Sequence, residues 1–241
     1  MKGVASYYNE FYQELARLDA AGNDYSKIAE LLEQDVGGTR SLRIADLGCG
    51  YGSVSGTLVL KGHRVYGVDI GDAALRALSE RGIHAIKGDL AHTMPIADGT
   101  MDIVLLLDVL EHVFNPLWLL AEVRRLLREG GALVITVPLY FDILDRARIL
   151  FSGSIVSYDN LVYGRQIARQ FRAYNYDHIR FFRPSDLEEM MRIAGFTIQK
   201  RIYVPIPSPG LLAPLRRPLR SLAQRFPGMF AHRMKIKAMK T

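Results

Sequence analysis

The stretch IADLGCGYGSVS, residues 44–55, places three glycines within five residues, directly after a short apolar run. Glycine has no Cβ, so Gly48, Gly50 and Gly52 allow a tight turn and a close approach of a ligand to the backbone. Their G-x-G-x-G spacing differs from the G-x-G-x-x-G of dinucleotide-binding loops, and no P-loop lysine follows them. An acid, Asp46, stands two residues before the first glycine and would repel a pyrophosphate. The stretch therefore predicts a cofactor loop that binds a group other than phosphate.

Strand and helix patterns alternate regularly around this loop. Apolar or alternating runs predict strands at residues 42–48, 64–70, 84–90, 101–110, 130–138, 196–204 and 229–240. Helical patterns lie between them, at residues 54–61, 73–81, 116–127 and 184–194. The alternation predicts a doubly wound α/β fold, in which helices cover both faces of a mostly parallel sheet. The last run is expected to pair antiparallel with its predecessor.

Acids stand at the ends of the second and third predicted strands. In an open α/β sheet, ligands bind beyond the carboxyl ends of the strands. There, Asp69 can accept hydrogen bonds from two ribose hydroxyls, and Asp89 can accept one from an adenine amino group. Each acid taken singly has a second interpretation, in which it caps a helix or a turn. Taken together with the glycine loop, they favour a site for an adenosine.

Five motifs occur in order: IADLGCGYG, VYGVDI, GDL, MDIVLLLDVLEHV and GGALVITVP. Together they resemble the class I, seven-stranded S-adenosylmethionine-dependent methyltransferases, in particular the branch that includes the ubiquinone-biosynthesis O-methyltransferases and many small-molecule enzymes. The resemblance covers residues 40–194 well. It extends to the terminal strand pair only through the pattern of apolar residues. It implies the strand order 3-2-1-4-5-7-6, with strand 7 antiparallel.

The resemblance also implies S-adenosylmethionine as cofactor, which leaves as S-adenosylhomocysteine. It implies that the cofactor is bound by ten residues: Asp46, Gly48, Cys49, Gly50, Gly52, Asp69, Ile70, Asp89, Leu90 and Asp108. The glycine loop would pass under the methionine part, and Asp46 would help to hold its amino group. Asp69 would bind the ribose, with Ile70 against the adenine. Asp108 would lie near the sulfonium.

Methyl transfer from a sulfonium is an in-line displacement that often needs a base to deprotonate the acceptor. His112 and His178 are the candidate catalytic residues, because imidazole titrates near neutral pH. His112 has a second interpretation, slightly favoured, in which it orders a turn; Glu111 shares this ambiguity. His178 begins a His-x-x-x-Phe pattern. It has two equal interpretations, as a catalytic base or as a residue with a packing or hinge role. No metal site is expected, since neither these histidines nor His232 show ligand spacing.

We expect a single domain, residues 1–241, in four parts. Residues 1–39 form a helical lid in which Tyr8 meets the cofactor, or else a plain packing helix. Residues 40–138 form the cofactor-binding core, and 139–178 an inserted helical acceptor-site segment. Aromatic residues there line an acceptor pocket or form the core of the insertion: Tyr140, Phe141, Phe151, Tyr158 and Tyr163. Residues 179–241 supply a helix and the final strand pair, with a basic amphipathic insertion.

The net charge of +6 is distributed unevenly. Residues 190–241 contain eleven Lys and Arg and no acid, which leaves 20 basic and 25 acidic residues in the first 189. The basic amphipathic stretch 211–226 indicates a peripheral contact with an anionic membrane, or else a loop with solvated arginines. The acidic body disfavours nucleic acid as a partner. The sequence assigns no oligomeric state.

The single cysteine, Cys49, excludes an intrachain disulfide and favours the cytoplasm. We expect neither a signal peptide nor a membrane-spanning segment. The sequence predicts O-methylation of a small or lipid-linked metabolite by in-line methyl transfer. The alternatives are an N- or C-methyltransferase acting on RNA or protein, and a non-catalytic subunit that binds S-adenosylmethionine.

Overall fold

The computed structural model of this chain describes residues 41–152, 178–205 and 216–241. Several predictions fall outside the described residues. These are the N-terminal lid with Tyr8, the part of the inserted segment that holds Tyr158 and Tyr163, and the beginning of the basic amphipathic stretch.

The described strands form one seven-stranded sheet. Their bounds are β1 Arg43–Leu47, β2 Arg64–Asp69, β3 His84–Lys87, β4 Met101–Leu107, β5 Leu127–Pro138, β6 Phe196–Pro205 and β7 Ala231–Lys240. Their order is β3-β2-β1-β4-β5-β7-β6. β7 pairs antiparallel with both β5 and β6, whereas the pairs among β1 to β5 are parallel. The predicted fold and strand order are confirmed.

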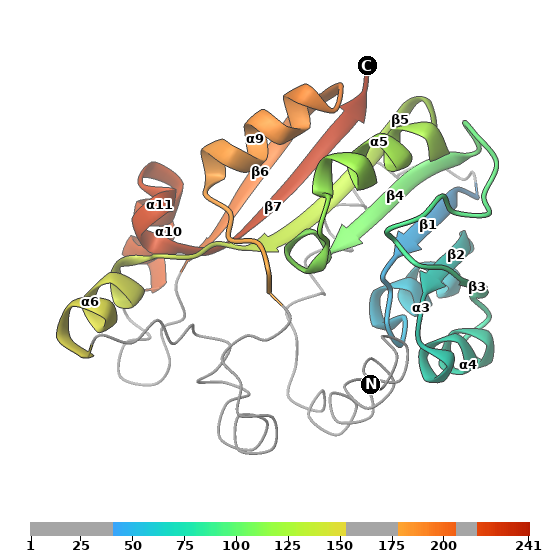
Figure 1. The fold of residues 1–241 in the computed structure, drawn as a ribbon, viewed down its shortest axis with the longest axis horizontal. Coiled ribbons are helices and arrows are strands. Elements are labelled where there is room, and N and C mark those ends of the chain that lie inside the picture. The colour runs from blue at the N-terminus through green and yellow to red at the C-terminus, as the bar shows by residue number, and fades with distance from the viewer. Residues whose placement is uncertain (1–40, 153–177, 206–215) are drawn as a thin grey trace.

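The helices follow the same chain order. Their bounds are α3 Ser53–Leu60, α4 Asp72–Glu80, the 3₁₀ turn η2 Leu110–His112, α5 Pro116–Leu126, α6 Ile143–Ser152, α9 Pro184–Ile193, α10 Arg216–Arg225 and α11 Pro227–Phe230. Helices α5 and α9 cover one face of the sheet, and α3 and α4 pack on the other. Figure 1 shows α6, α10 and α11 together at the end of the sheet beyond β6 and β7.

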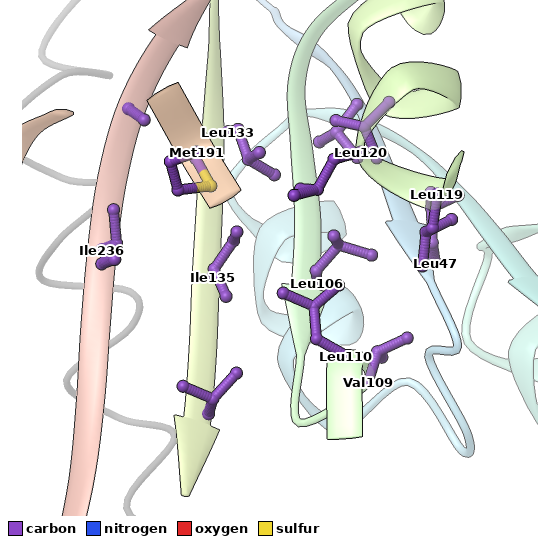
Figure 2. Close-up of a cluster of buried hydrophobic side chains, with 14 of the residues drawn as sticks. Leu47, Leu106, Val109, Leu110, Leu119, Leu120, Leu133, Ile135, Met191 and Ile236 are labelled. Atoms are coloured by element: carbon purple, nitrogen blue, oxygen red, sulfur yellow. The ribbon is translucent and has the colours of Figure 1, made fainter. Parts of the chain in front are cut away.

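The core under α5 and α9 is the larger of the two hydrophobic clusters. Leu119 and Leu120 of α5 and Met191 of α9 contact side chains of β4, β5 and β7 such as Leu106 and Ile236 (Figure 2). Both faces of β4 are buried, in agreement with its unbroken apolar run. The sheet is therefore a rigid base whose carboxyl edge can position loops.

Local signals explain where α5 begins. The side chain of Asn115 caps the helix by accepting a hydrogen bond from the amide of Trp118 at 3.0 Å, and Pro116 occupies its first position. Pro218 likewise lies in the first turn of α10, where a missing amide hydrogen is tolerated. None of the helices in the described part of the chain has the length and hydropathy that crossing a bilayer requires.

The structure differs from the sequence pattern in β7. The pattern alternates apolar residues with Arg233, Lys235 and Lys237, as expected of a strand with one solvent-exposed face. Lys235 and Lys237 are nevertheless buried, so the face of β7 that carries them is not exposed to solvent. β5 also begins three residues earlier than predicted, at Leu127.

Candidate functional site

The glycine loop lies at the carboxyl edge of β1, against the end of β2. The amides of Gly48 and Cys49 both donate to the carbonyl of Val68, at 2.8 and 3.2 Å. Gly48, Gly50 and Gly52 all have φ between +52° and +71°, a region that favours glycine. The three glycines are therefore required by the turn itself, and the turn keeps backbone rather than side chains at the strand end.

Gly52 is required for a second reason. It precedes α3, and a Cβ there would lie 2.6 Å from Leu78 and 2.7 Å from Ile83, both in the core. At Gly48, a Cβ would lie 2.9 Å from Val109 and 3.4 Å from Leu90. Leu90, expected to bind the cofactor, thus lies beside the glycine loop.

Asp46 is a buried acid at the second-last position of β1. Its carboxylate accepts a hydrogen bond of 2.5 Å from the hydroxyl of Ser55, which begins to close the loop onto α3. Burial, together with the nearby carboxylate of Asp69, raises the pKa of Asp46 to about 6, although the bond from Ser55 opposes the shift. A buried carboxylate of this kind favours a cationic ligand group.

Asp69 connects two loops. One carboxylate oxygen accepts from the amide of Gly50 at 2.9 Å, and the other accepts from the amide of Gly71 at 2.8 Å. Asp69 therefore caps turns through backbone amides, as its second interpretation predicted. Each carboxylate oxygen can accept more than one hydrogen bond, so capping is compatible with binding a ribose.

Asp89 also caps a turn, at a more exposed position. It accepts from the amide of Ala91 at 2.9 Å, and its second oxygen lies 3.4 Å from Nδ1 of His92. Ile70, after β2, is half-buried. Burial raises the pKa of the Cys49 thiol, which keeps this group of the loop neutral.

Asp108 follows β4 in a left-handed conformation, with φ of +55°. Thr136 of β5 donates its hydroxyl to the Asp108 carboxylate at 2.9 Å. The guanidinium of Arg233, from β7, donates to the other carboxylate oxygen at 2.6 Å. These contacts hold Asp108 at the sheet edge. The sequence signalled neither Thr136 nor Arg233, because their proximity depends on how β5 and β7 pair.

The fold brings His178 beside Glu111. The carbonyl of Glu111 accepts from the amides of Ile179 and Arg180, at 2.8 and 3.1 Å, which holds the returning chain against η2. Nε2 of His178 then lies 4.0 Å from Oε1 of Glu111, whose side chain is fully buried. On the other side of the ring, Nδ1 of His178 is hydrogen-bonded to the hydroxyl of Tyr140, which follows β5.

His112 completes a cluster with these residues. Its ring packs edge-on against His178, with 4.7 Å between ring centroids. One potential ligand atom from each of Glu111, His112 and His178 lies within 4.8 Å of the others. The histidines show no ligand spacing in the sequence, yet the fold places three groups together that could hold a divalent cation or exchange a proton.

Aromatic side chains border this cluster. The rings of Tyr140 and Phe181 pack edge-on with centroids 4.7 Å apart, and Phe141 lies next to Phe181. Phe141 has φ of +66°, which is costly for a bulky residue and is often found at functional sites. Phe151, also expected here, lies at the far end of α6 and is exposed. Phe181 belongs to this group and was not among the expected residues.

The family described as "Methyltransferase domain" matches residues 45–135, the part of the chain that carries β1 to β5 and the glycine loop. A ubiquinone biosynthesis O-methyltransferase from Psychrobacter arcticus is 27% identical over 187 residues, which cover 73% of this chain and 65% of that protein. An uncharacterized 37.1 kDa protein in transposon TN4556 of Streptomyces fradiae is 36% identical over 136 residues, which cover 53% of this chain and 38% of that protein. The chain therefore spans less than two thirds of the length of both relatives.

Two solved structures share the fold. A possible histamine N-methyltransferase from Thermotoga maritima has a TM-score of 0.66 at 19% identity, covering 98% of this chain and 99% of that one. A magnesium protoporphyrin IX methyltransferase from Synechocystis PCC 6803, with bound SAH, has a TM-score of 0.64 at 17% identity, covering 99% of this chain and 98% of that one.

Proposed function

We propose, from the premise that this chain belongs to the class I S-adenosylmethionine-dependent methyltransferases, that it catalyses O-methylation of a small or lipid-linked metabolite. One observation carries the proposal. The buried acids and glycine loop at the ends of β1 and β2 share the carboxyl edge of the sheet with the Glu111–His178–Tyr140 cluster. This arrangement supports a cofactor site next to a proton-accepting site.

The donor groups at the strand ends suit S-adenosylmethionine. When bound, this cofactor supplies a methyl group on a positively charged sulfur. Asp46, buried and with a pKa raised to about 6, offers a carboxylate that a ligand amino group would stabilise. Asp69 faces the same loop and offers acceptors for ribose hydroxyls, with Ile70 and Leu90 beside the adenine. A phosphate would meet two carboxylates here and be repelled.

The acceptor hydroxyl has to lose a proton when the methyl group is transferred. Tyr140 can accept that proton on its phenolic oxygen while it passes its own proton to Nδ1 of His178. The carboxylate of Glu111, 4.0 Å from Nε2, then stabilises the imidazolium by charge. His178 thus acts as the base through Tyr140, and Glu111 is a positioning residue.

The class of acceptor is inferred from the side chains that border Tyr140. The rings of Phe141 and Phe181 beside Tyr140 suit a partly apolar acceptor. The relative from Psychrobacter arcticus is described as an enzyme of ubiquinone biosynthesis, which agrees with such an acceptor. We propose that the protein works in the cytoplasm and reaches a membrane peripherally through its basic C-terminal stretch.

Calorimetric titration tests the cofactor first. We expect S-adenosylmethionine and S-adenosylhomocysteine to bind the full chain, and NAD not to bind. Absence of S-adenosylmethionine binding would refute the proposal. Acceptor profiling with methyl-labelled cofactor against fractionated cell extract then identifies the product. Label in a methyl ether supports O-methylation, whereas label on nitrogen, on carbon or in a macromolecule would overturn it.

A further inference from the structure

Large apolar side chains are exposed at the end of the sheet where α6, α10 and α11 gather (Figure 1). On α6, Leu144 and Phe151 lie seven residues apart and hence on the same side of the helix. Leu150 is 78% exposed and Phe151 is 85% exposed. Phe226 and Met229, at the junction of α10 and α11, are exposed as well. We call these five side chains the apolar face.

The two halves of the apolar face are connected directly. The guanidinium of Arg146, on α6, donates to the carbonyl of Phe141 at 2.7 Å and to the carbonyl of Gly228, in α11, at 3.1 Å. Segments more than eighty residues apart in the sequence are thereby held side by side. The apolar face is therefore a property of the fold and not of one amphipathic stretch.

Positively charged side chains lie on α10, next to the part of the apolar face that Phe226 and Met229 form. Arg217, Arg220 and Arg225 of α10 are exposed, and residues 216–241 contain neither aspartate nor glutamate. The guanidinium of Arg225 lies 5.7 Å from the centre of the Phe226 ring, so one apolar and one cationic group project together. The acids at the start of α6, Asp142 and Asp145, accept hydrogen bonds from backbone amides.

We propose that the apolar face docks on the surface of an anionic phospholipid bilayer. Exposed Leu, Phe and Met side chains gain free energy when they enter the boundary between head groups and acyl chains. The exposed arginines of α10 would contact the lipid phosphates. Each of them contributes to the attraction by a negatively charged leaflet. The combination of exposed apolar side chains with the exposed arginines of α10 suits this partner.

The position of the apolar face gives it a role in substrate access. α6 begins three residues after Tyr140, and Arg146 holds the carbonyl of Phe141 beside the aromatic residues of the acceptor site. Docking would turn this side of the site toward the lipid. This inference rests on the proposed function, and it selects the lipid-linked acceptor over a freely diffusing one.

Co-sedimentation of the full chain with vesicles tests the docking. We expect binding to vesicles of phosphatidylcholine with phosphatidylglycerol, and little binding to phosphatidylcholine alone. The double variants Leu150→Glu/Phe151→Glu and Arg217→Glu/Arg220→Glu should each lower the affinity about tenfold or more. Leu60→Glu is the matched control, since Leu60 is 89% exposed on α3, away from the apolar face, and should bind as the wild type does.

Calorimetry with S-adenosylmethionine separates this inference from the proposed function. The surface variants should keep the cofactor affinity of the wild type, which also shows that they are folded. Equal vesicle binding by the wild type and both double variants, or no binding by the wild type, overturns the docking and leaves the enzyme proposal intact. Vesicle binding without cofactor binding refutes the enzyme proposal and leaves the docking intact.

Discussion

Tyr140 and His178 are 38 positions apart in the sequence, and the fold joins them through a hydrogen bond between the Tyr140 hydroxyl and Nδ1 of His178. Tyr140 follows β5, whereas His178 begins the segment that returns past η2 toward α9. The bond unites a residue expected to line the acceptor pocket with one expected to be a base. The proposed path of the proton follows from this contact.

Replacing His178 tests that path. We expect His178→Ala and Tyr140→Phe to lower kcat by roughly a hundredfold or more, because each removes a step of the proton transfer. Cofactor affinity should change little, since the contacts described for these side chains join them to each other, to Glu111 and His112, and to Phe181. Steady-state kinetics and calorimetry measure the two effects, and His63→Ala, beyond the far end of α3, is the control. Unchanged turnover in both His178→Ala and His112→Ala would exclude histidine as the base.

The Asp69 carboxylate should be essential for cofactor binding. Asp69→Ala removes acceptors for the ribose and also releases the amides of Gly50 and Gly71, so the loop loses its shape. We expect calorimetry to detect no binding of S-adenosylmethionine. Asp72→Ala is the control, because Asp72 forms an exposed ion pair with Lys87. Near-normal affinity in the Asp69 variant would contradict the assignment of this strand end to the cofactor.

Asp46 should make cofactor affinity depend on pH. Its pKa is raised from 3.8 to about 6, so a bound amino group that favours the carboxylate must displace a proton below that value. Affinity should therefore rise as the pH increases from 5 to 7. Asp46→Asn should bind weakly and show no such rise. Equal slopes in the two proteins, measured by calorimetry, would contradict a contact between Asp46 and the amino group.

The same shift predicts the pH dependence of stability without cofactor. The native pKa of Asp46 lies above its unfolded value, so the folded protein binds more protons between about pH 4 and 6. The contribution of Asp46 is then most favourable below pH 4 and is lost as the pH rises through 6. Urea unfolding should show the difference between wild type and Asp46→Asn changing by about 3 kcal/mol across this window. A constant difference would mean that the native pKa is not raised.

Gly52 should tolerate no side chain. Gly52→Ala strains a backbone with φ of +69° and also presses on Leu78 and Ile83. Gly62→Ala is the matched control, because Gly62 has φ of +86° and no atom within 4 Å of the added Cβ. We expect both to destabilise the protein and Gly52→Ala to cost about 1–3 kcal/mol more, through overpacking. Equal unfolding free energies for Gly52→Ala and Gly62→Ala would show that the core adjusts to the added methyl group at Gly52.

Removing metal ions should leave turnover unchanged. Methyl transfer needs alignment and proton removal, and the proposed path supplies the base from His178 through Tyr140 without a bound cation. Dialysis of the protein against a chelator, followed by kinetic assay, checks this expectation. A loss of activity that Mg²⁺ or Zn²⁺ restores would instead assign Glu111, His112 and His178 to a metal site.

The sequence predicted the fold because the signals that specify it are local. Hydrophobic period, the glycines that follow α3, α4 and α9, and the cap at Asn115 act within a few residues, so strand and helix bounds could be derived from them. The buried lysines of β7 escaped prediction for the opposite reason. Their alternation indicates a solvent-exposed face, whereas both lysines are buried, and the burial of a sheet face depends on how elements distant in the sequence pack.

The sequence by itself determined the glycine loop and the acids at the strand ends, since the carboxyl edge of a parallel sheet brings successive strand ends together. The tertiary structure decided which distant groups meet there: Glu111 with His178, Arg233 with Asp108, and α6 with α11. These contacts join segments separated by many residues, and no period or motif encodes them. They depend on the packing of whole elements, because only packing sets the distance between side chains that are far apart in the chain.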